Sequence, residues 1–372
     1  MGVPVTLLAS ASGQSSPSMR NSTIRHSSII ASHMCGCSYK TRLYGGKLVR
    51  TFLTIYRIDM NVDEVKDRAG PREFSPKDDL PEEYRKAATR MLEFHANSEI
   101  MGAFLERPFI RKAPSIERKM AFSAKVQDEI GHGQMLYRAA ESLGVKTREE
   151  MLDDLANGDG KFLNCFHYPM ESYVETPMIA FFVDGAAMRR QATLKKSSWE
   201  PYAHAMDKIC FEEGMHVKHG ESILRELMNG SRKEQRMTQE AFEEWWPRIL
   251  QFFGPTDDQS THHDFAAEVG LKTCTNDELR TAFLNTYIPK AKKYGLEMPD
   301  EPRIRENGDG SYEVVEDDLD WDEFFTVSQN EYEGSIEQIT GRRQAQEAVQ
   351  WVRDMMDDQT TTNSGPQSQA AD

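Results

Sequence analysis

Long apolar runs, cysteine spacings typical of metal clusters and nucleotide-binding glycine motifs are all missing from this 372-residue sequence. No stretch of about eighteen apolar residues occurs, which excludes an ordinary transmembrane helix and predicts no membrane association. The five cysteines fit no zinc or iron–sulfur spacing, and no Gly-x-Gly-x-x-Gly motif follows a predicted strand. We therefore expect a cytoplasmic protein that neither binds a nicotinamide cofactor nor carries an iron–sulfur cluster itself.

Basic residues are also fewer than acidic ones. The sequence has 45 Lys and Arg residues against 60 Asp and Glu residues, for a formal net charge of −15. Nucleic-acid affinity depends on clustered Lys and Arg, so we expect no nucleic-acid partner. An acid excess suits a protein that must stay soluble in high salt, but ordinary acidic proteins share it, and both readings stay open.

The first part of the chain differs in composition from everything after it. Residues 1–60 contain seven basic residues and one acidic residue, and they are rich in serine. We expect residues 1–79 to form a largely disordered N-terminal extension. Its start superficially resembles a transit peptide, but the abrupt change of composition favours Met60 as the true start of translation.

The proline, glycine and capping residues that mark helix ends predict an all-α fold built on a ferritin-like four-helix bundle over residues 80–235. The expected long helices cover residues 81–106, 114–143, 174–195 and 201–228, with a loop at 108–114 and a short helix at 148–156. Residues 236–356 are expected to form an accessory region for subunit contacts, with helices near 238–254 and 276–295 and a hairpin at 303–318. A disordered tail is expected over residues 357–372.

Polar residues occupy positions of the second long helix that should face the core. Residues three or four apart share one face of a helix, and this rule places Lys125, Glu129 and His132 in line with Phe122 and Leu136. A buried carboxylate without a partner costs several kcal/mol, so it requires a cation or a metal ion nearby.

The same arrangement recurs on the other long helices. The fourth helix carries a second Glu-x-x-His pair, Glu213 and His216, on its core stripe, and the third and first helices each contribute one acid, Asp184 and Glu99. Two Glu-x-x-His helices and two single carboxylates form the di-iron site of ferritin-like bundles, although aspartate at 184 replaces the usual glutamate.

The charges of this set suit two divalent ions. Four carboxylates and two neutral imidazoles together with two Fe²⁺ give a nearly neutral core, and oxygen-rich ligation favours iron or manganese over zinc. We predict that the metal ligands and catalytic residues are Glu99, Glu129, His132, Asp184, Glu213 and His216. Lys125 is added as a catalytic candidate that neutralises the site when metal is absent, and the alternative is a buried network of ion pairs.

Several motifs resemble one enzyme family. The stretches "ANSEIMG", "AKVQDEIGHG", "VDGAA" and "KICFEEGMH", followed by "WWP" and "FGP", are similar to the catalytic A subunits of phenylacetyl-CoA 1,2-epoxidases, which are bacterial multicomponent monooxygenases. The likeness covers residues 81–330. It implies that the six residues above bind two iron ions and that Lys125 lies beside them.

The resemblance also implies a reaction and a set of partners. The implied reaction is epoxidation of the aromatic ring of phenylacetyl-CoA with O₂, in aerobic phenylacetate degradation. Electrons would come from NADPH through a separate reductase with FAD and an iron–sulfur cluster. The resemblance implies two further partners: a non-catalytic ferritin-like subunit and a small bridging subunit.

Two alternatives remain at this point. The chain could epoxidise another aromatic acyl-CoA, such as benzoyl-CoA, or it could be a non-catalytic, iron-binding ferritin-like protein. The full set of six ligands and the long region after the bundle favour the oxygenase.

Overall fold

The computed structural model describes residues 43–44, 47–48, 60–256, 263–331 and 333–363. The chain divides into two units, Met1–Tyr56 and Arg57–Asp372. The described part of the first unit is one antiparallel strand pair, β1 (Leu43–Tyr44) and β2 (Lys47–Leu48). The rest of the predicted extension before residue 60 lies outside the described residues.

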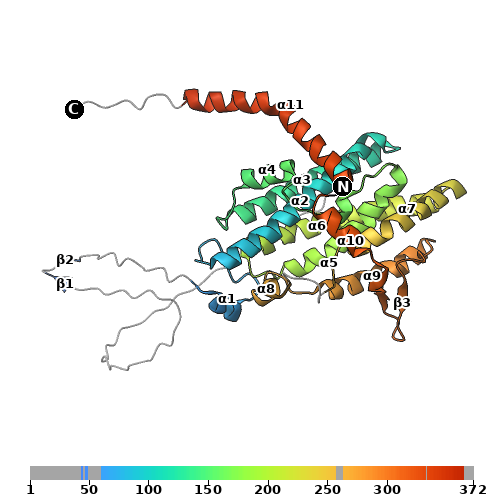
Figure 1. Cartoon of the computed structure of the whole chain (residues 1–372), viewed down its shortest axis with the longest axis horizontal. Coiled ribbons are helices and arrows are strands. Elements are labelled where there is room, and N and C mark those ends of the chain that lie inside the picture. The colour runs from blue at the N-terminus through green and yellow to red at the C-terminus, as the bar shows by residue number, and fades with distance from the viewer. Residues whose placement is uncertain (1–42, 45–46, 49–59, 257–262, 332, 364–372) are drawn as a thin grey trace, which may run out of the picture. The chain divides into compact units, whose positions relative to one another are not determined.

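The second unit is the predicted all-α bundle (Figure 1). Helices α2 (Glu82–Lys112) and α3 (Ile116–Glu141) form one pair, and α5 (Asp184–Leu194) and α6 (Glu200–Met228) form the other. The two pairs meet where α3 contacts α6. The remaining elements are α1 (Val62–Arg68), α4 (Arg148–Asn157), η1 (Asn164–His167), η2 (Tyr173–Glu175), η3 (Met178–Val183), α7 (Arg232–Gln251), α8 (His263–Glu268), α9 (Asn276–Lys293), β3 (Ile304–Glu306), β4 (Tyr312–Val314), η5 (Glu316–Asp318), α10 (Trp321–Ser328) and α11 (Glu333–Asn363).

Helix α2 is longer than predicted. It passes through Pro108 and ends at Lys112, whereas the sequence predicted a loop from residue 108 to residue 114. A proline ring fixes φ near the helical value and removes only one N–H donor. The fully buried Phe109 ring and the hydrogen bond from Ala113 N–H to Phe109 O hold the turn that follows Pro108 in the helix.

The third long helix spans its predicted range but is not α-helical throughout. It is divided into the 3₁₀ turn η2, the π-helical segment η3 and α5. Pro177 precedes η3 and has no N–H to donate. All six residues of η3 are buried, and rings from α7 and α9 cover this segment, where Phe182 contacts Phe242 and Tyr287. The π segment ends directly before Asp184.

Segments at both ends of the predicted domain map are more ordered than expected. Residues 60–79 contain α1, whose start is closed by reciprocal hydrogen bonds between Asn61 and Glu64, and both Val65 and Phe74 are fully buried. At the other end α11 continues to Asn363, because adding residues to an existing helix costs less than starting one. Residues 364–372 lie outside the described part of the chain.

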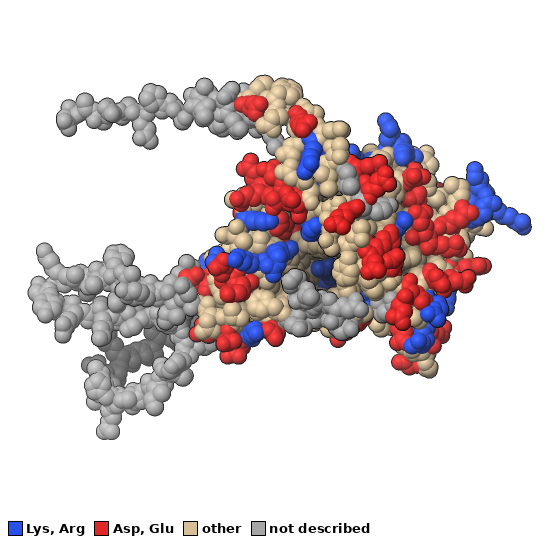
Figure 2. All heavy atoms as spheres, in the orientation of Figure 1, with Lys and Arg blue, Asp and Glu red and all other residues tan. Residues whose placement is uncertain are grey.

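Residues 236–356 contain the predicted helices and hairpin. Strands β3 and β4 pair as an antiparallel hairpin, and α9 occupies the predicted range. Helix α7 begins at Arg232, six residues before its predicted start near residue 238, because Ser231 and Glu234 cap its first turn. Among the described residues no helix has the length and apolar character needed to cross a membrane. On the face in Figure 2, acidic side chains are widely spread with basic ones among them.

One close contact between backbones holds α6 against the π segment. A Cβ atom added at Gly220 would lie 2.3 Å from the backbone carbon of Ala180. We expect Gly220→Ala to lower the free energy of unfolding by about 3 kcal/mol, because neither backbone can move without disturbing the bundle. Chemical denaturation would measure this change.

A matched control lies on the same helix. A Cβ atom at Gly214 would meet no atom within 4 Å. Gly214→Ala should therefore be neutral or stabilise the protein by up to about 1 kcal/mol, through helix propensity. Equal effects of the two substitutions would show that the contact with Ala180 does not matter.

Candidate metal centre

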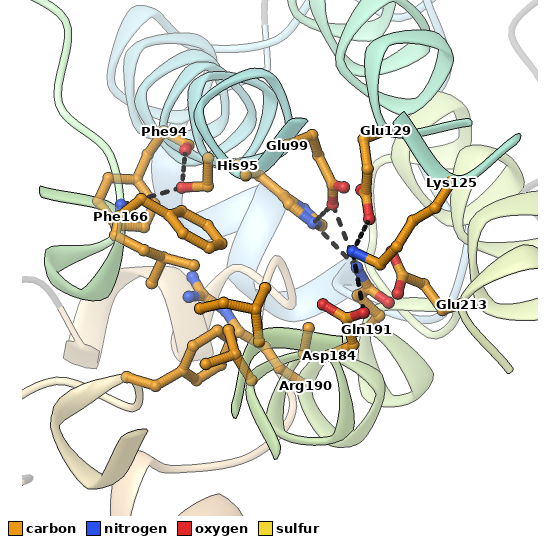
Figure 3. Close-up of a pocket in the computed structure, with 17 residues that line it drawn as sticks. Phe94, His95, Glu99, Lys125, Glu129, Phe166, Asp184, Arg190, Gln191 and Glu213 are labelled. Atoms are coloured by element: carbon orange, nitrogen blue, oxygen red, sulfur yellow. Dashed lines mark hydrogen bonds and ion pairs between the residues drawn. The ribbon is translucent and has the colours of Figure 1, made fainter. Parts of the chain in front are cut away.

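All six predicted ligands come together in the middle of the bundle, and all six are buried. They come from four elements: Glu99 from α2, Glu129 and His132 from α3, Asp184 from the start of α5, and Glu213 and His216 from α6. Figure 3 shows the carboxylates of Glu99, Glu129, Asp184 and Glu213 around one space.

These side chains form two overlapping groups of four, and in each group the ligand atoms lie within 4.8 Å of one another. One group contains Glu99 and His132, the other contains Asp184 and His216, and both contain Glu129 and Glu213. Together the two groups offer the four carboxylates and two imidazoles that would hold two cations.

The buried ring nitrogens support a metal site over a network of hydrogen bonds. His132 Nδ1 lies 3.4 Å from Glu99 Oε2 and 3.5 Å from an oxygen of Glu129, yet it forms no hydrogen bond. His216 Nδ1 lies 3.2 Å from Glu129 Oε1 and 3.4 Å from Glu213 Oε2, and neither contact has the geometry of a hydrogen bond. Buried polar atoms are rarely left unsatisfied, and four carboxylates with two imidazoles are the donors that Fe²⁺ or Mn²⁺ accepts. The residues therefore fit a pair of such ions.

The far nitrogen of each histidine has an acidic partner on the opposite helix, which the sequence predictions missed. His132 Nε2 on α3 lies 2.9 Å from Glu212 Oε2 on α6, and His216 Nε2 on α6 lies 3.3 Å from Asp128 Oδ2 on α3. Each of these acids directly precedes a glutamate on the core-facing stripe of its helix. The same pair of adjacent acids occurs on both helices, and this repetition could have indicated the two partners from the sequence. Such partners fix the ring orientation and make the other nitrogen a better ligand.

Removing these outer acids should weaken the metal site without emptying it. We expect Glu212→Gln or Asp128→Asn to lower metal affinity about 10- to 100-fold, because each histidine loses a charged hydrogen-bond acceptor. Competition with a chelator of known affinity would measure the change. An unchanged affinity in both variants would contradict the role assigned to the pair.

Lys125 lies among three buried carboxylates. Its Nζ contacts Glu106, lies 2.9 Å from Glu129 Oε1 and lies 3.1 Å from Asp184 Oδ2. Burial opposes the charged form, but Asp184, Glu106 and Glu129 outweigh it and raise the pKa of Lys125. The sequence predictions also missed Glu106, although its place seven residues after Glu99 puts it on the same face of α2.

His95 and Gln191 contact Glu99, and Tyr202 in turn contacts His95. His95 Nε2 lies 2.9 Å from Glu99 Oε1, His95 Nδ1 lies 2.8 Å from the Tyr202 hydroxyl, and Gln191 Nε2 donates to Glu99 Oε1 at 3.2 Å. Burial, aided by the charge of Arg190, lowers the pKa of His95 to about 3. His95 is therefore neutral at physiological pH and orients the Glu99 carboxylate without adding charge.

A small cavity of about 40 Å³ opens beside the carboxylates (Figure 3). Glu99, Lys125, Glu129, Asp184 and Glu213 line one end of it. Its other walls are mainly apolar and include Phe94, Leu163, Phe166, Ile179, Val183 and Phe252.

Metal binding at this site should release protons. Burial alone would lower the pKa of His216, but Glu129 and Glu213 overcome this effect and raise the pKa to about 11. The imidazole is therefore protonated in the metal-free protein at neutral pH, whereas a metal ion binds only the neutral ring. We expect affinity for Mn²⁺ to rise with pH between about 6 and 8, and calorimetry in buffers of different ionisation enthalpy should detect the released protons. Identical heats in all buffers would contradict this expectation.

Comparison with known proteins agrees with this geometry. A family model described as phenylacetic acid catabolic protein matches residues 60–351. The chain is also 38% identical over 280 residues to the A subunit of the 1,2-phenylacetyl-CoA epoxidase of Escherichia coli (strain K12). That match covers 75% of this chain and 89% of the relative. The chain therefore belongs to the phenylacetic acid catabolic protein family.

Proposed function

We propose that this chain is the catalytic oxygenase subunit of a multicomponent di-iron monooxygenase that epoxidises the aromatic ring of phenylacetyl-CoA. The observation that carries the proposal is the pair of buried groups that share Glu129 and Glu213, in a chain related over most of its length to an epoxidase subunit. A scaffold protein would have no use for this costly concentration of buried carboxylates.

The six residues Glu99, Glu129, His132, Asp184, Glu213 and His216 would hold two iron ions. When bound, the di-iron centre supplies the reductive activation of O₂. Four carboxylates balance the charge of two Fe²⁺, while Asp128 and Glu212 fix the orientation of the two imidazoles. Lys125 supplies a positive charge to the carboxylates when the metal is absent.

The cavity beside the carboxylates would receive the aromatic ring. Its apolar walls exclude water and place the ring next to the ligands of the metal ions. Its volume of about 40 Å³ is smaller than the roughly 150 Å³ that holds a benzene molecule in an engineered protein cavity. We therefore expect the lining side chains to move apart when the substrate enters.

The chain would depend on partner proteins for electrons and for assembly. Since its sequence has neither a dinucleotide-binding motif nor an iron–sulfur spacing, electrons from NADPH would arrive through a separate reductase with FAD and an iron–sulfur cluster. A non-catalytic ferritin-like subunit, together with a small bridging subunit, completes the proposed complex, which we place in the cytoplasm.

The test is reconstitution with these partners. The chain, the ferritin-like and bridging subunits and the reductase would be mixed with NADPH, ¹⁸O₂ and a panel of acyl-CoA substrates that includes phenylacetyl-CoA and benzoyl-CoA. We expect mass spectrometry to find one ¹⁸O atom in the phenylacetyl-CoA product. Oxidation of benzoyl-CoA alone, or of neither substrate by an iron-loaded complex, would contradict the proposal.

A further inference from the structure

Among the residues that the structure describes, Arg190 in the wall of the cavity is a cation without an ionic partner. Its guanidinium lies 5.9 Å from the centre of the Phe94 ring, and within the described part of the chain it forms no hydrogen bond or ion pair. Burial lowers its pKa. The neighbouring Arg189 differs, because it is exposed and donates to Thr286 Oγ1 at 2.8 Å. A partly buried guanidinium whose donors meet no protein acceptor can donate them to a ligand that enters the cavity.

Arg190 also marks the open end of the cavity. The lining residues at the carboxylate end are buried, whereas Phe94, His95, Ala187 and Arg190 are partly exposed. The cavity therefore opens between α2 and α5. In Figure 3, Phe94, Phe166 and the end of the Arg190 side chain lie on one side of the cavity, and Lys125 and Glu213 lie on the other.

Arg190 lies further along α5 than Asp184, toward the open end of the cavity. Asp184 begins α5 and Arg190 follows six residues later, which corresponds to about 9 Å along the helix axis. A phenylacetyl group with its ring beside the carboxylates would bring its thioester carbonyl to this depth. The phosphates of coenzyme A would remain outside, because the long pantetheine arm separates them from the thioester.

We propose that Arg190 donates a hydrogen bond to the thioester carbonyl oxygen of the bound substrate and so fixes the depth of the aromatic ring. This inference rests on the proposed function. The Phe94 ring packs against the guanidinium, and the carbonyl supplies the acceptor that the described residues do not provide. A benzoyl thioester is one methylene shorter than a phenylacetyl thioester. If its carbonyl bound to Arg190, the benzoyl ring would lie further from the carboxylates than the phenylacetyl ring.

The experiment measures binding rather than turnover. Affinities of the assembled complex for two ligands would be determined by calorimetry without reductant: phenylacetyl-CoA, and its thioether analogue, in which CH₂ replaces the carbonyl. The wild-type complex should bind the thioether about 10- to 100-fold more weakly, which is the loss expected for a hydrogen bond to a charged donor. Arg190→Met should bind phenylacetyl-CoA more weakly by a similar factor and should not distinguish the two ligands.

Two further variants serve as controls. Arg190→Lys keeps a donor and should recover part of the preference for the carbonyl, and Arg189→Met should behave as the wild type. Melting temperature and metal content would show that each variant is folded. The inference is overturned if Arg190→Met binds phenylacetyl-CoA normally, or if it weakens both ligands equally and keeps the preference. If the wild-type complex does not bind phenylacetyl-CoA, the proposed function itself fails, and this inference fails with it.

Discussion

Replacing Glu129 by alanine is expected to reduce epoxidation of phenylacetyl-CoA at least about 1,000-fold. Glu129 belongs to both groups of ligands, so its loss affects both metal positions. A bound metal ion contributes several kcal/mol to the stabilisation of developing charge, which corresponds to a rate factor of this order. The measurement is product formation per reconstituted complex, together with the metal content of each chain.

A surface glutamate provides the matched control. Glu149 is exposed in the first turn of α4, and Glu149→Ala should keep full activity and metal content. If Glu129→Ala retained more than a tenth of the wild-type activity, the carboxylate would have no essential role and the proposed ligand set would be wrong.

Replacing Lys125 by methionine is expected to destabilise the metal-free protein by about 3–5 kcal/mol. The substitution keeps much of the side-chain volume but leaves Glu106, Glu129 and Asp184 without their shared buried cation. Breaking a buried ion pair on one side usually costs this much. Urea denaturation of metal-free wild-type and variant protein would give the difference.

A second substitution separates lost charge from lost packing. Adding Glu106→Gln to Lys125→Met removes one of the unpaired acids and should recover part of the lost stability. If the double variant were as unstable as the sum of the two single variants, the ion pair would not explain the effect. Metal-loaded Lys125→Met should lose less stability, because the metal ions then neutralise the carboxylates.

The sequence predicts the bundle and the geometry of its centre well, because both follow from helical periodicity. Glu129 with His132, and Glu213 with His216, lie on stripes that must face the core, and the structure brings them together with Glu99 and Asp184. Their roles as metal ligands remain predictions that the experiments above test.

The features that the sequence does not reveal depend on contacts between distant residues. The π segment before Asp184 forms where α6 approaches it at Gly220. No local sequence pattern predicts this contact between the two helices. Asp128 lies one position away from the core stripe and resembles a solvated acid until its histidine partner on the other helix is known. Pro108 predicts a helix end from local rules, which the buried Phe109 overrides.

The most direct test of the central claim is an anaerobic titration of the metal-free chain, assembled with its ferritin-like partner, with Fe²⁺. We predict saturation at two ions per catalytic chain, with both lost or weakened in Glu129→Ala. No binding under these conditions would mean that the six residues form only a network of buried ion pairs. Uptake far beyond two ions per chain would indicate iron storage and would also contradict the account.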